Sequence, residues 1–333
     1  MSFYRWCASA RPTATKTKTV FLFWRAVLVC GTLFFGCTIF LRMNGLLILD
    51  KPQGFTSHDV VARVRKLTGE RSIGHLGTLD PMATGVLPLL LGKYTRLAQF
   101  FVQDGKRYTG SICFGFATDT YDAEGACVGA VVAPALTLEQ IREQARGLQG
   151  WIEQTPPPYS AKKIAGKPAY KLARAGVAVE LRAVPIEVRR LELLHYDAPL
   201  ARFDMEVSSG GYIRSIAHDL GQRLGCGAHL ASLRRVQAGE WTIDQAVTLD
   251  DLTAWAAEGA IEAHLPHPRT LLPQMPAVTV DAITAGRLRH GVACNLPEFG
   301  TAPLVRIFTS QRDLLGIGRR IAGTLMQPMV VLG

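Results

Sequence analysis

The residues best suited to chemistry in this sequence lie in the segment 71–85, RSIGHLGTLDPMATG, which contains one imidazole, His75, and one carboxylate, Asp80. Its glycines and its proline argue against a regular helix or a long strand. Leu79 and Pro81 flank Asp80, so we expect the carboxylate in partly apolar surroundings on a stiff backbone. Asp-Pro pairs are common in turns, whereas loops braced by core elements often carry functional side chains. From these residues alone, a simple turn and a catalytic carboxylate both stay open.

Separated segments of the chain resemble, in the right order, the motifs of the TruB family of tRNA pseudouridine synthases. The first is GHLGTLDPMATG at residues 74–85, and KRY follows at residues 106–108. The next is SGGYIRSIAHDLG at residues 209–221, completed by GCGAHLASLRR at residues 225–235. The resemblance covers residues 43–250 and is far more specific than a single dipeptide.

The resemblance implies roles for particular side chains. Asp80 would be the nucleophile, and Arg214 would orient its carboxylate and keep it ionised. Apolar surroundings raise the pKa of a carboxyl group, and an adjacent guanidinium opposes that effect. Tyr108 would stack on the uracil, and its second role would be to help transfer the proton from C5. The further substrate-binding residues implied by the family are His75, Tyr108, Tyr212, Leu233 and Lys51, the last in an architectural role.

The expected reaction is an isomerisation, classed as an intramolecular transfer. A synthase of this family breaks the N-glycosidic bond of a uridine in the TΨC loop of tRNA and rejoins the uracil through C5. Because no redox change or outside energy is needed, the resemblance implies no cofactor and no metal. Attack by Asp80 on C6 of the uracil and on C1′ of the ribose are both compatible with the sequence. The base must be flipped out of the loop, and His75 would fill the vacated space.

Two other functions share part of this evidence. A pseudouridine synthase acting on another RNA would also need a nucleophile, but the GHLGTLDP and KRY motifs favour the TruB type. A tRNA-binding folding chaperone would not need the trio Asp80, Tyr108 and Arg214, which therefore favours the enzyme. RNA loops are read through shape and splayed bases. We expect the T-arm of tRNA as the partner, a monomeric protein and a cytoplasmic location.

Several other motifs fail on closer inspection. Residues 91–95 suggest a phosphate loop, but Leu87 stands where that motif needs glycine. The acidic segment 118–125 lacks the spacing of an EF-hand, and it resembles a family segment that adjoins the active site. His218 and His229 have no accompanying metal-ligand set, and we expect them in a helix and a loop. Seven cysteines without a Cys-x-x-Cys pair indicate neither a disulfide framework nor a zinc ribbon.

The charge of the chain is unevenly distributed. The 333 residues carry a formal net charge of +10, of which residues 1–42 supply +6. Net charge therefore supports nucleic-acid binding only weakly, and a basic patch must be local. The densest cluster, a candidate RNA track, consists of Lys162, Lys163, Lys167, Lys171 and Arg174.

The first 42 residues form a distinct segment. Residues 20–41 are almost continuously apolar, broken by Arg25, and are long enough to span a bilayer. A membrane anchor, an organellar targeting segment and translated upstream sequence all fit this pattern. Met43 is followed by NGLLILDKP, which resembles the opening of bacterial family members, so we predict Met43 as the true start.

The family implies an α+β fold, in which a mixed, largely antiparallel sheet is flanked by helices and Asp80 lies in a central cleft. We expect the pseudouridine synthase catalytic domain at residues 43–262 and a small β module at 275–333, where the family has a PUA-type RNA-binding domain. Apolar periodicity and turn residues predict strands at 45–50, 108–116, 185–196 and 201–208. Caps and apolar faces predict helices starting near Thr56, at 94–102, at 137–148, after Tyr212 and at Thr248.

Overall fold

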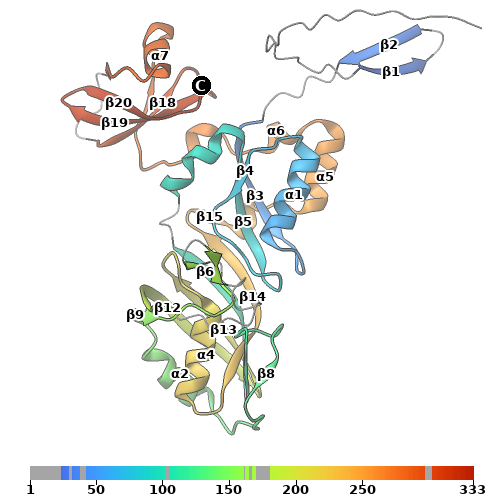
Figure 1. The fold of residues 1–333 in the computed structure, drawn as a ribbon, viewed down its shortest axis with the longest axis vertical. Coiled ribbons are helices and arrows are strands. Elements are labelled where there is room, and N and C mark those ends of the chain that lie inside the picture. Colours follow the sequence, from blue (N-terminus) through green and yellow to red (C-terminus); the bar gives the residue numbers. More distant parts are fainter. Residues whose placement is uncertain are drawn as a thin grey trace, which may run out of the picture. The chain divides into compact units, whose positions relative to one another are not determined.

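The computed structural model describes residues 24–29, 32–37, 43–101, 105–160, 162–164, 167–169, 181–296 and 302–333 (Figure 1). The chain divides into two units, Met1–Arg42 and Met43–Gly333. Each unit is described by itself.

The first unit contains a β-hairpin. Strand β1 (Trp24–Val29) pairs antiparallel with β2 (Thr32–Cys37). The described part of the apolar segment 20–41 is therefore extended and not helical. Across the described ranges of the whole chain, no helix is both long and apolar enough to cross a membrane.

The second unit is built on a nine-stranded sheet with the main order β3-β5-β14-β6-β13-β12-β9, to which β4 adds at β5 and β15 at β14 (Figure 1). These strands are β3 (Gly45–Lys51), β4 (Ile73–His75), β5 (Thr84–Leu91), β6 (Lys106–Phe114), β9 (Gly150–Gln154), β12 (Val184–Asp197), β13 (Leu200–Val207), β14 (Ala228–Ala238) and β15 (Trp241–Thr242). The pair β5–β14 is parallel, and the other neighbours are antiparallel. This is the mixed, largely antiparallel sheet that was predicted.

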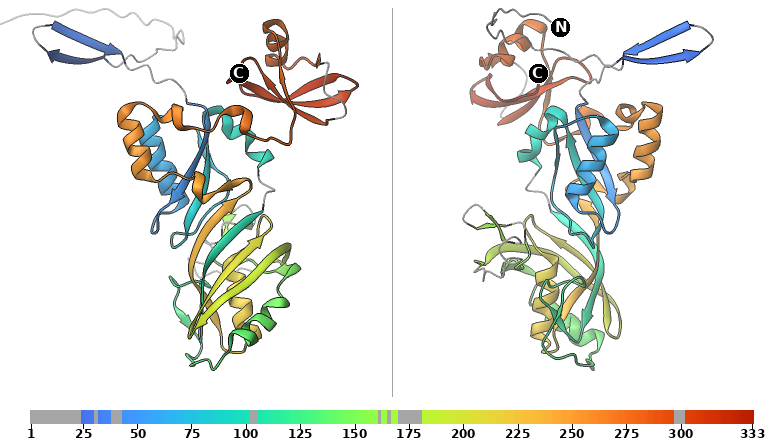
Figure 2. Two further views of the ribbon diagram at one scale, coloured as in Figure 1. Left: turned by 180° about the vertical axis from the view of Figure 1, so that it is seen from behind. Right: turned by 45° about the vertical axis from the view of Figure 1, so that its right-hand side comes forward.

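Helices flank this sheet at two places. Near β3 lie α1 (Ser57–Thr68) and α5 (Leu249–Glu258), followed by the short α6 (Ile261–His264). Helices α2 (Leu138–Arg146) and α4 (Ile213–Arg223) lie side by side against the other half (Figure 2). The 3₁₀ helices are η1 (Gly92–Phe100), η2 (Ile243–Gln245) and η3 (Pro268–Thr270). Helices α1, α2 and α5 each start with a threonine capping box, because a hydroxyl at that position satisfies an otherwise free backbone N–H.

A continuous apolar core joins the helices to the sheet. Helix α1 contributes Val60, Val61 and Val64, and α4 contributes its predicted apolar face. That face consists of Ile213, Ile216, Ala217 and Leu220, all buried. Burying a valine or leucine side chain stabilises the fold by about 1.5–3 kcal/mol. Since α4 is fixed by this burial, the residues at its N-terminus are held at a defined place beside the sheet.

Two small hairpins lie outside the main sheet. Strand β7 (Ala117–Thr118) pairs with β8 (Cys127–Val128), and β10 (Lys163–Ile164) pairs with β11 (Lys167–Pro168). The predicted basic RNA track falls partly on β10 and β11. Its members Lys171 and Arg174 lie outside the described residues.

The C-terminal part forms a five-stranded sheet in the order β16-β18-β19-β20-β17. Its elements are β16 (Ala277–Thr279), α7 (Ala282–Arg289), β17 (Cys294–Asn295), β18 (Leu304–Phe308), β19 (Leu314–Ala322) and β20 (Leu325–Val331). Ala285 and Leu288 of α7 pack with Ile307 and Met326 in a separate small core. The predicted β character of this segment is confirmed, whereas helix α7 was not predicted.

Two local predictions differ from the structure. The segment predicted as a helix over residues 94–102 forms the 3₁₀ helix η1. His229, expected in a loop, lies in β14, where it pairs with Cys113 of β6. The glycines at 225 and 227 indicate a turn, but the backbone pairing with β6 begins immediately after them.

Candidate active site

The loop between β4 and β5 carries Asp80. It leaves β4 at His75 and enters β5 at Thr84. Gly85 has a φ of +102°, and a Cβ there would lie 2.2 Å from the backbone oxygen of Arg235. Only glycine allows both this left-handed conformation and the close approach of β14. The glycine after the loop thus fixes how the loop joins the sheet.

Arg235 ties this loop to β5 from the protein interior. Its side chain is fully buried, and Nε donates to the oxygen of Val86 at 2.7 Å. Nη2 donates to the oxygen of Gly77 at 3.1 Å. A buried guanidinium needs such acceptors because unpaired donors are costly away from water. No role was predicted for Arg235, because nothing local in the sequence marks an arginine as buried.

Lys51 supports the same loop from β3. Its side chain is fully buried, and Nζ donates to the oxygens of Pro52 at 3.0 Å, Phe55 at 2.5 Å and Pro81 at 3.2 Å. Burial lowers the pKa of Lys51 to about 8, an effect opposed chiefly by the charge of Asp80. These bonds tie the backbone directly after Asp80 to the connection between β3 and α1.

Asp80 and Arg214 form a two-point ion pair. Arg214 Nε lies 2.9 Å from Asp80 Oδ2, and Nη2 donates to Oδ1 at 3.1 Å. The Asp80 side chain is 32% exposed, whereas that of Arg214 is 6% exposed. Burial raises the pKa of Asp80, and the Arg214 guanidinium opposes this rise. The pair therefore presents one accessible carboxylate whose orientation is set by a buried fork.

The remaining donors of Arg214 are held by two other segments. Nη1 donates to the oxygen of Thr120 at 3.1 Å and lies 3.5 Å from Asp122 Oδ2, and Nη2 also donates to the oxygen of Tyr159 at 3.0 Å. Asp122 is buried and accepts from Thr120 Oγ1 at 2.6 Å. Asp122 thus holds Arg214 from the side opposite Asp80. The family resemblance connects segment 118–125 with the active site but does not single out Asp122.

Backbone strain marks the same segment. Tyr121, between Thr120 and Asp122, has a φ of +67°, which side-chain-bearing residues rarely adopt. Its ring stacks on that of His218 from α4, with centroids 3.8 Å apart. This stacking links the strained loop to the helix that carries Arg214.

Tyr108 and Leu233 share one face of the sheet. Tyr108 in β6 pairs with Arg235 in β14, and Leu233 pairs with Gly110. Because paired residues point to the same side and side chains alternate along a strand, both side chains lie on the face that also holds the core. Both are buried, and both belong to the apolar cluster that includes Leu79 and Met82 of the Asp80 loop. The structure therefore brings these predicted residues together.

Tyr212 lies at the start of α4, where β13 passes into the helix. Gln154 clamps its backbone: Tyr212 N donates to Gln154 Oε1 at 2.8 Å, and Gln154 Nε2 donates to Tyr212 O at 2.9 Å. Burial raises the pKa of Tyr212. A Cβ at Gly211 would lie 3.2 Å from Val207 Cγ2, a tight contact.

His75 lies at the end of β4, near the start of the Asp80 loop. Its ring is half-buried and meets the ring of His58 edge-on, with centroids 5.9 Å apart. Burial lowers the pKa of His75. Within the described part of the chain its buried Nδ1 has no hydrogen-bond partner. Burial thus favours the neutral form of this ring.

The other histidines considered above have structural contacts. His229 Nδ1 donates to the oxygen of Phe116 at 3.2 Å, and the two rings lie 4.5 Å apart. Among the residues that the structure covers, no group of His, Cys, Asp or Glu side chains is arranged to hold a metal ion.

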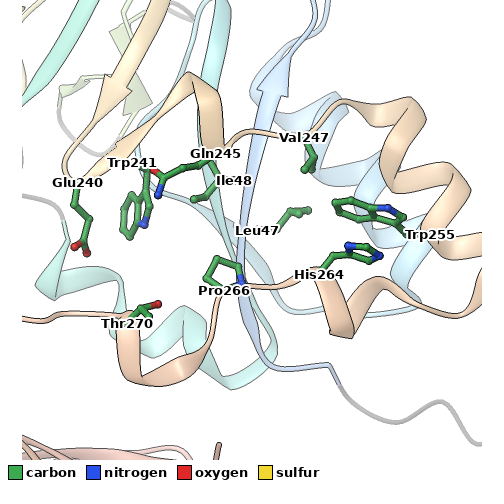
Figure 3. A pocket seen from close by; sticks show the side chains of 10 residues that line it. All are labelled: Leu47, Ile48, Glu240, Trp241, Gln245, Val247, Trp255, His264, Pro266 and Thr270. Atoms are coloured by element: carbon green, nitrogen blue, oxygen red, sulfur yellow. The ribbon is translucent and has the colours of Figure 1, made fainter.

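Cavities lie both near this site and away from it. One of about 280 Å³ is lined by Met82 and Leu233, among others. Another, of about 240 Å³, lies over β3 and is lined by Trp241, Trp255 and His264, the last two with stacked rings (Figure 3). None of the predicted site residues lines this second cavity.

Known protein families match residues 65–332 of the chain. Residues 65–213 match "TruB family pseudouridylate synthase (N terminal domain)". Residues 214–275 match "tRNA pseudouridylate synthase B C-terminal domain", and residues 276–332 match "Pseudouridine synthase II TruB, C-terminal". The fold is thus that of a pseudouridine synthase, an isomerase.

Relatives make the assignment more specific. The tRNA pseudouridine synthase B of Solibacter usitatus is 45% identical over 293 residues, which cover 87% of this chain and 100% of that protein. That of Aquifex aeolicus is 41% identical over 285 residues, covering 85% and 98%. The chain belongs to the TruB family.

Solved structures share the fold. A chain in the structure of an H/ACA RNP bound to a substrate RNA containing 2′-deoxyuridine matches with a TM-score of 0.64 at 25% identity, covering 87% of this chain and 85% of that chain. A chain of a Cbf5-Nop10-Gar1 complex matches with a TM-score of 0.63 at 26% identity, covering 87% and 85%.

Proposed function

We propose that this chain converts the uridine of the TΨC loop in tRNA to pseudouridine, with Asp80 as the nucleophile. The observation that carries the proposal is the ion pair between Asp80 and Arg214, with contacts of 2.9 and 3.1 Å. It leaves an oriented carboxylate one-third exposed within the loop between β4 and β5. The names of the relatives, which are tRNA pseudouridine synthases, supply the RNA class.

The proposed chemistry is an isomerisation. The Asp80 carboxylate attacks C6 of the uracil or C1′ of the ribose, and the bond between N1 and C1′ breaks. The uracil turns, C5 bonds to C1′, and the bond between Asp80 and C6 or C1′ breaks, which restores the carboxylate. The proton on C5 is lost and N1 gains a proton. Since the product has the composition of the substrate, we propose that no redox cofactor takes part.

The proposed substrate must reach Asp80 by base flipping, since its target atoms are stacked within a folded loop. Tyr108 would stack on the uracil, and Leu233 and Tyr212 would form further walls of the pocket. His75, at the edge of the Asp80 loop, would occupy the space that the base leaves. The half-burial and lowered pKa of His75 support a neutral stacking ring in this role.

Residues 43–333 would contain two parts with different functions, one catalytic and one that binds RNA. We propose residues 43–262 as the catalytic domain and residues 275–333 as a PUA-like RNA-binding module that contacts the T-arm. The small core around α7 and the separate family match over residues 276–332 support this division. We further propose that the protein acts as a monomer in the cytoplasm, where its substrate would be.

Single-turnover pseudouridine formation on an unmodified tRNA transcript tests this function. The wild-type chain is compared with Asp80→Asn, which keeps the size of the side chain and removes its charge. We expect pseudouridine in the TΨC loop from the wild type, and RNA binding without reaction from the variant. Product from both proteins would contradict the role of Asp80. Pseudouridine formed at another position of the RNA would contradict the proposal that the TΨC-loop uridine is the substrate. An Asp80→Asn protein that still accelerates tRNA folding would show an additional chaperone activity.

A further inference from the structure

A single hydroxyl group holds both backbone polar groups of the residue before Asp80. Ser57 is the first residue of α1, and its side chain is 1% exposed. Leu79 N donates to Ser57 Oγ at 2.9 Å, and Ser57 Oγ donates to Leu79 O at 3.2 Å. The hydroxyl thus takes the place that a neighbouring strand would have in a sheet.

The loop needs such support because it has no strand partner at this point. Strand β4 ends at His75 and β5 begins at Thr84. Between them, carbonyl groups of alternate residues are held from outside the loop: that of Gly77 by Arg235, and that of Pro81 by Lys51 and by Gly54 N. Leu79 lies midway between these two points and is held by Ser57.

The position of the hydroxyl is itself fixed. Val60, Val61 and Val64 anchor the helix in the core. Ser57 therefore presents its Oγ from a rigid element, which is the arrangement that keeps a catalytic group within a fraction of an ångström of its working position.

We propose that Ser57 is a positioning residue for Asp80, an inference that rests on the proposed function. Ser57 bonds Leu79 and does not itself reach the reacting atoms. Its removal frees the backbone next to Asp80 but leaves the RNA-facing surface unchanged. The effect should therefore fall on the chemical step and not on RNA affinity, and a misplacement of about 1 Å can cost roughly 100-fold in rate.

A purely structural role makes a different prediction, and Thr56→Ala is the matched control. That variant removes the hydroxyl one residue earlier, which caps the same helix through Asp59. It should lower Tm while the loop contacts remain. If Ser57 only stabilises α1, then Ser57→Ala and Thr56→Ala should lower Tm and leave the single-turnover rate unchanged in both cases.

The experiment measures three quantities on the full chain: Tm, Kd for an unmodified tRNA transcript, and the single-turnover rate at saturating enzyme. We expect Ser57→Ala to slow the reaction by about 10- to 100-fold with Kd within about twofold of wild type. We expect Thr56→Ala to keep both values within about twofold. Ser57→Cys, which fills the same space with a weaker hydrogen-bonding group, should also react more slowly and remains measurable if the alanine variant unfolds.

The outcomes separate the two proposals. The positioning role would be overturned if the wild type is active and Ser57→Ala, or a folded Ser57→Cys protein, reacts at the same single-turnover rate. A fall in RNA affinity that accounts for the whole loss would also overturn it. A wild-type protein that forms no pseudouridine would instead contradict the proposed function.

Discussion

Replacing Arg214 with lysine asks whether a positive charge is enough to orient Asp80 or whether the guanidinium fork is needed. The fork contacts Asp80 through two nitrogens, Nε and Nη2. It also holds the oxygens of Thr120 and Tyr159 and faces Asp122. A lysine has one nitrogen on a flexible stem and can keep at most one of the two contacts with Asp80.

The magnitude follows from the lost contact. A hydrogen bond to a charged group contributes about 1.5–3 kcal/mol. If that bond orients the nucleophile, its loss should slow the chemical step by roughly 10- to 150-fold, since each 1.36 kcal/mol is a factor of ten. RNA affinity should change little because the Arg214 side chain is 6% exposed.

The assay is single-turnover pseudouridine formation at saturating enzyme, with Kd for the transcript measured in parallel. Arg223→Lys is the matched control, since Arg223 is an exposed arginine in the last turn of the same helix. We expect the control to react at the wild-type rate. A folded Arg214→Lys protein with a rate within twofold of wild type would refute the reasoning, because charge alone would then suffice. A loss confined to Kd would refute it as well.

The remaining predictions concern pH and backbone geometry. The single-turnover rate should decrease at low pH, with an apparent pKa above 3.8. The reason is that the nucleophile must be ionised and that burial raises the pKa of Asp80. An apparent pKa of the rate at or below 3.8 would contradict this. Lys51 has a pKa of about 8 when folded and 10.5 as its ordinary value, so the unfolded chain binds more protons between these pH values. The free energy of unfolding of wild type relative to Lys51→Met should therefore rise from pH 8 to pH 10.5, and urea titrations with a flat difference would disprove it. Gly85→Ala should lower the free energy of unfolding, measured with denaturant, by roughly 3 kcal/mol, because its Cβ would lie 2.2 Å from Arg235 O. Gly129→Ala, with a φ of +82° and open space around it, should lower it by only about 1 kcal/mol. Equal losses for the two variants would show that the clash at Gly85 is relieved.

Much of the secondary structure could be predicted from the sequence, because local patterns determine it. The threonines at 56, 137 and 248 mark three helix starts, since a hydroxyl cap acts within one turn. The apolar face of α4 follows from its 3.6-residue period. The strand order was not predicted, because nothing in the local pattern states that β14 pairs with both β5 and β6.

The motifs in the sequence predicted the main residues of the candidate site, whereas only the folded structure shows the residues that hold them in place. Asp80 and Arg214 are 134 residues apart and could be paired only through the resemblance. Asp122, Ser57 and Arg235 had no signal of their own in the sequence. An aspartate in a turn, a serine at a helix start and an arginine in a strand are ordinary in those places, and burial alone reveals their roles.

The sequence by itself therefore determined the longer helices, four strands of the main sheet and the family motifs, including the loop that carries Asp80, since these depend on residues close together in the chain. The tertiary structure decided how the loop is held: Ser57 meets Leu79 across 22 residues, and Arg235 meets Gly77 across 158. Buried polar groups must find partners wherever the fold brings them. Such partners are chosen by three-dimensional proximity, which one-dimensional spacing does not encode.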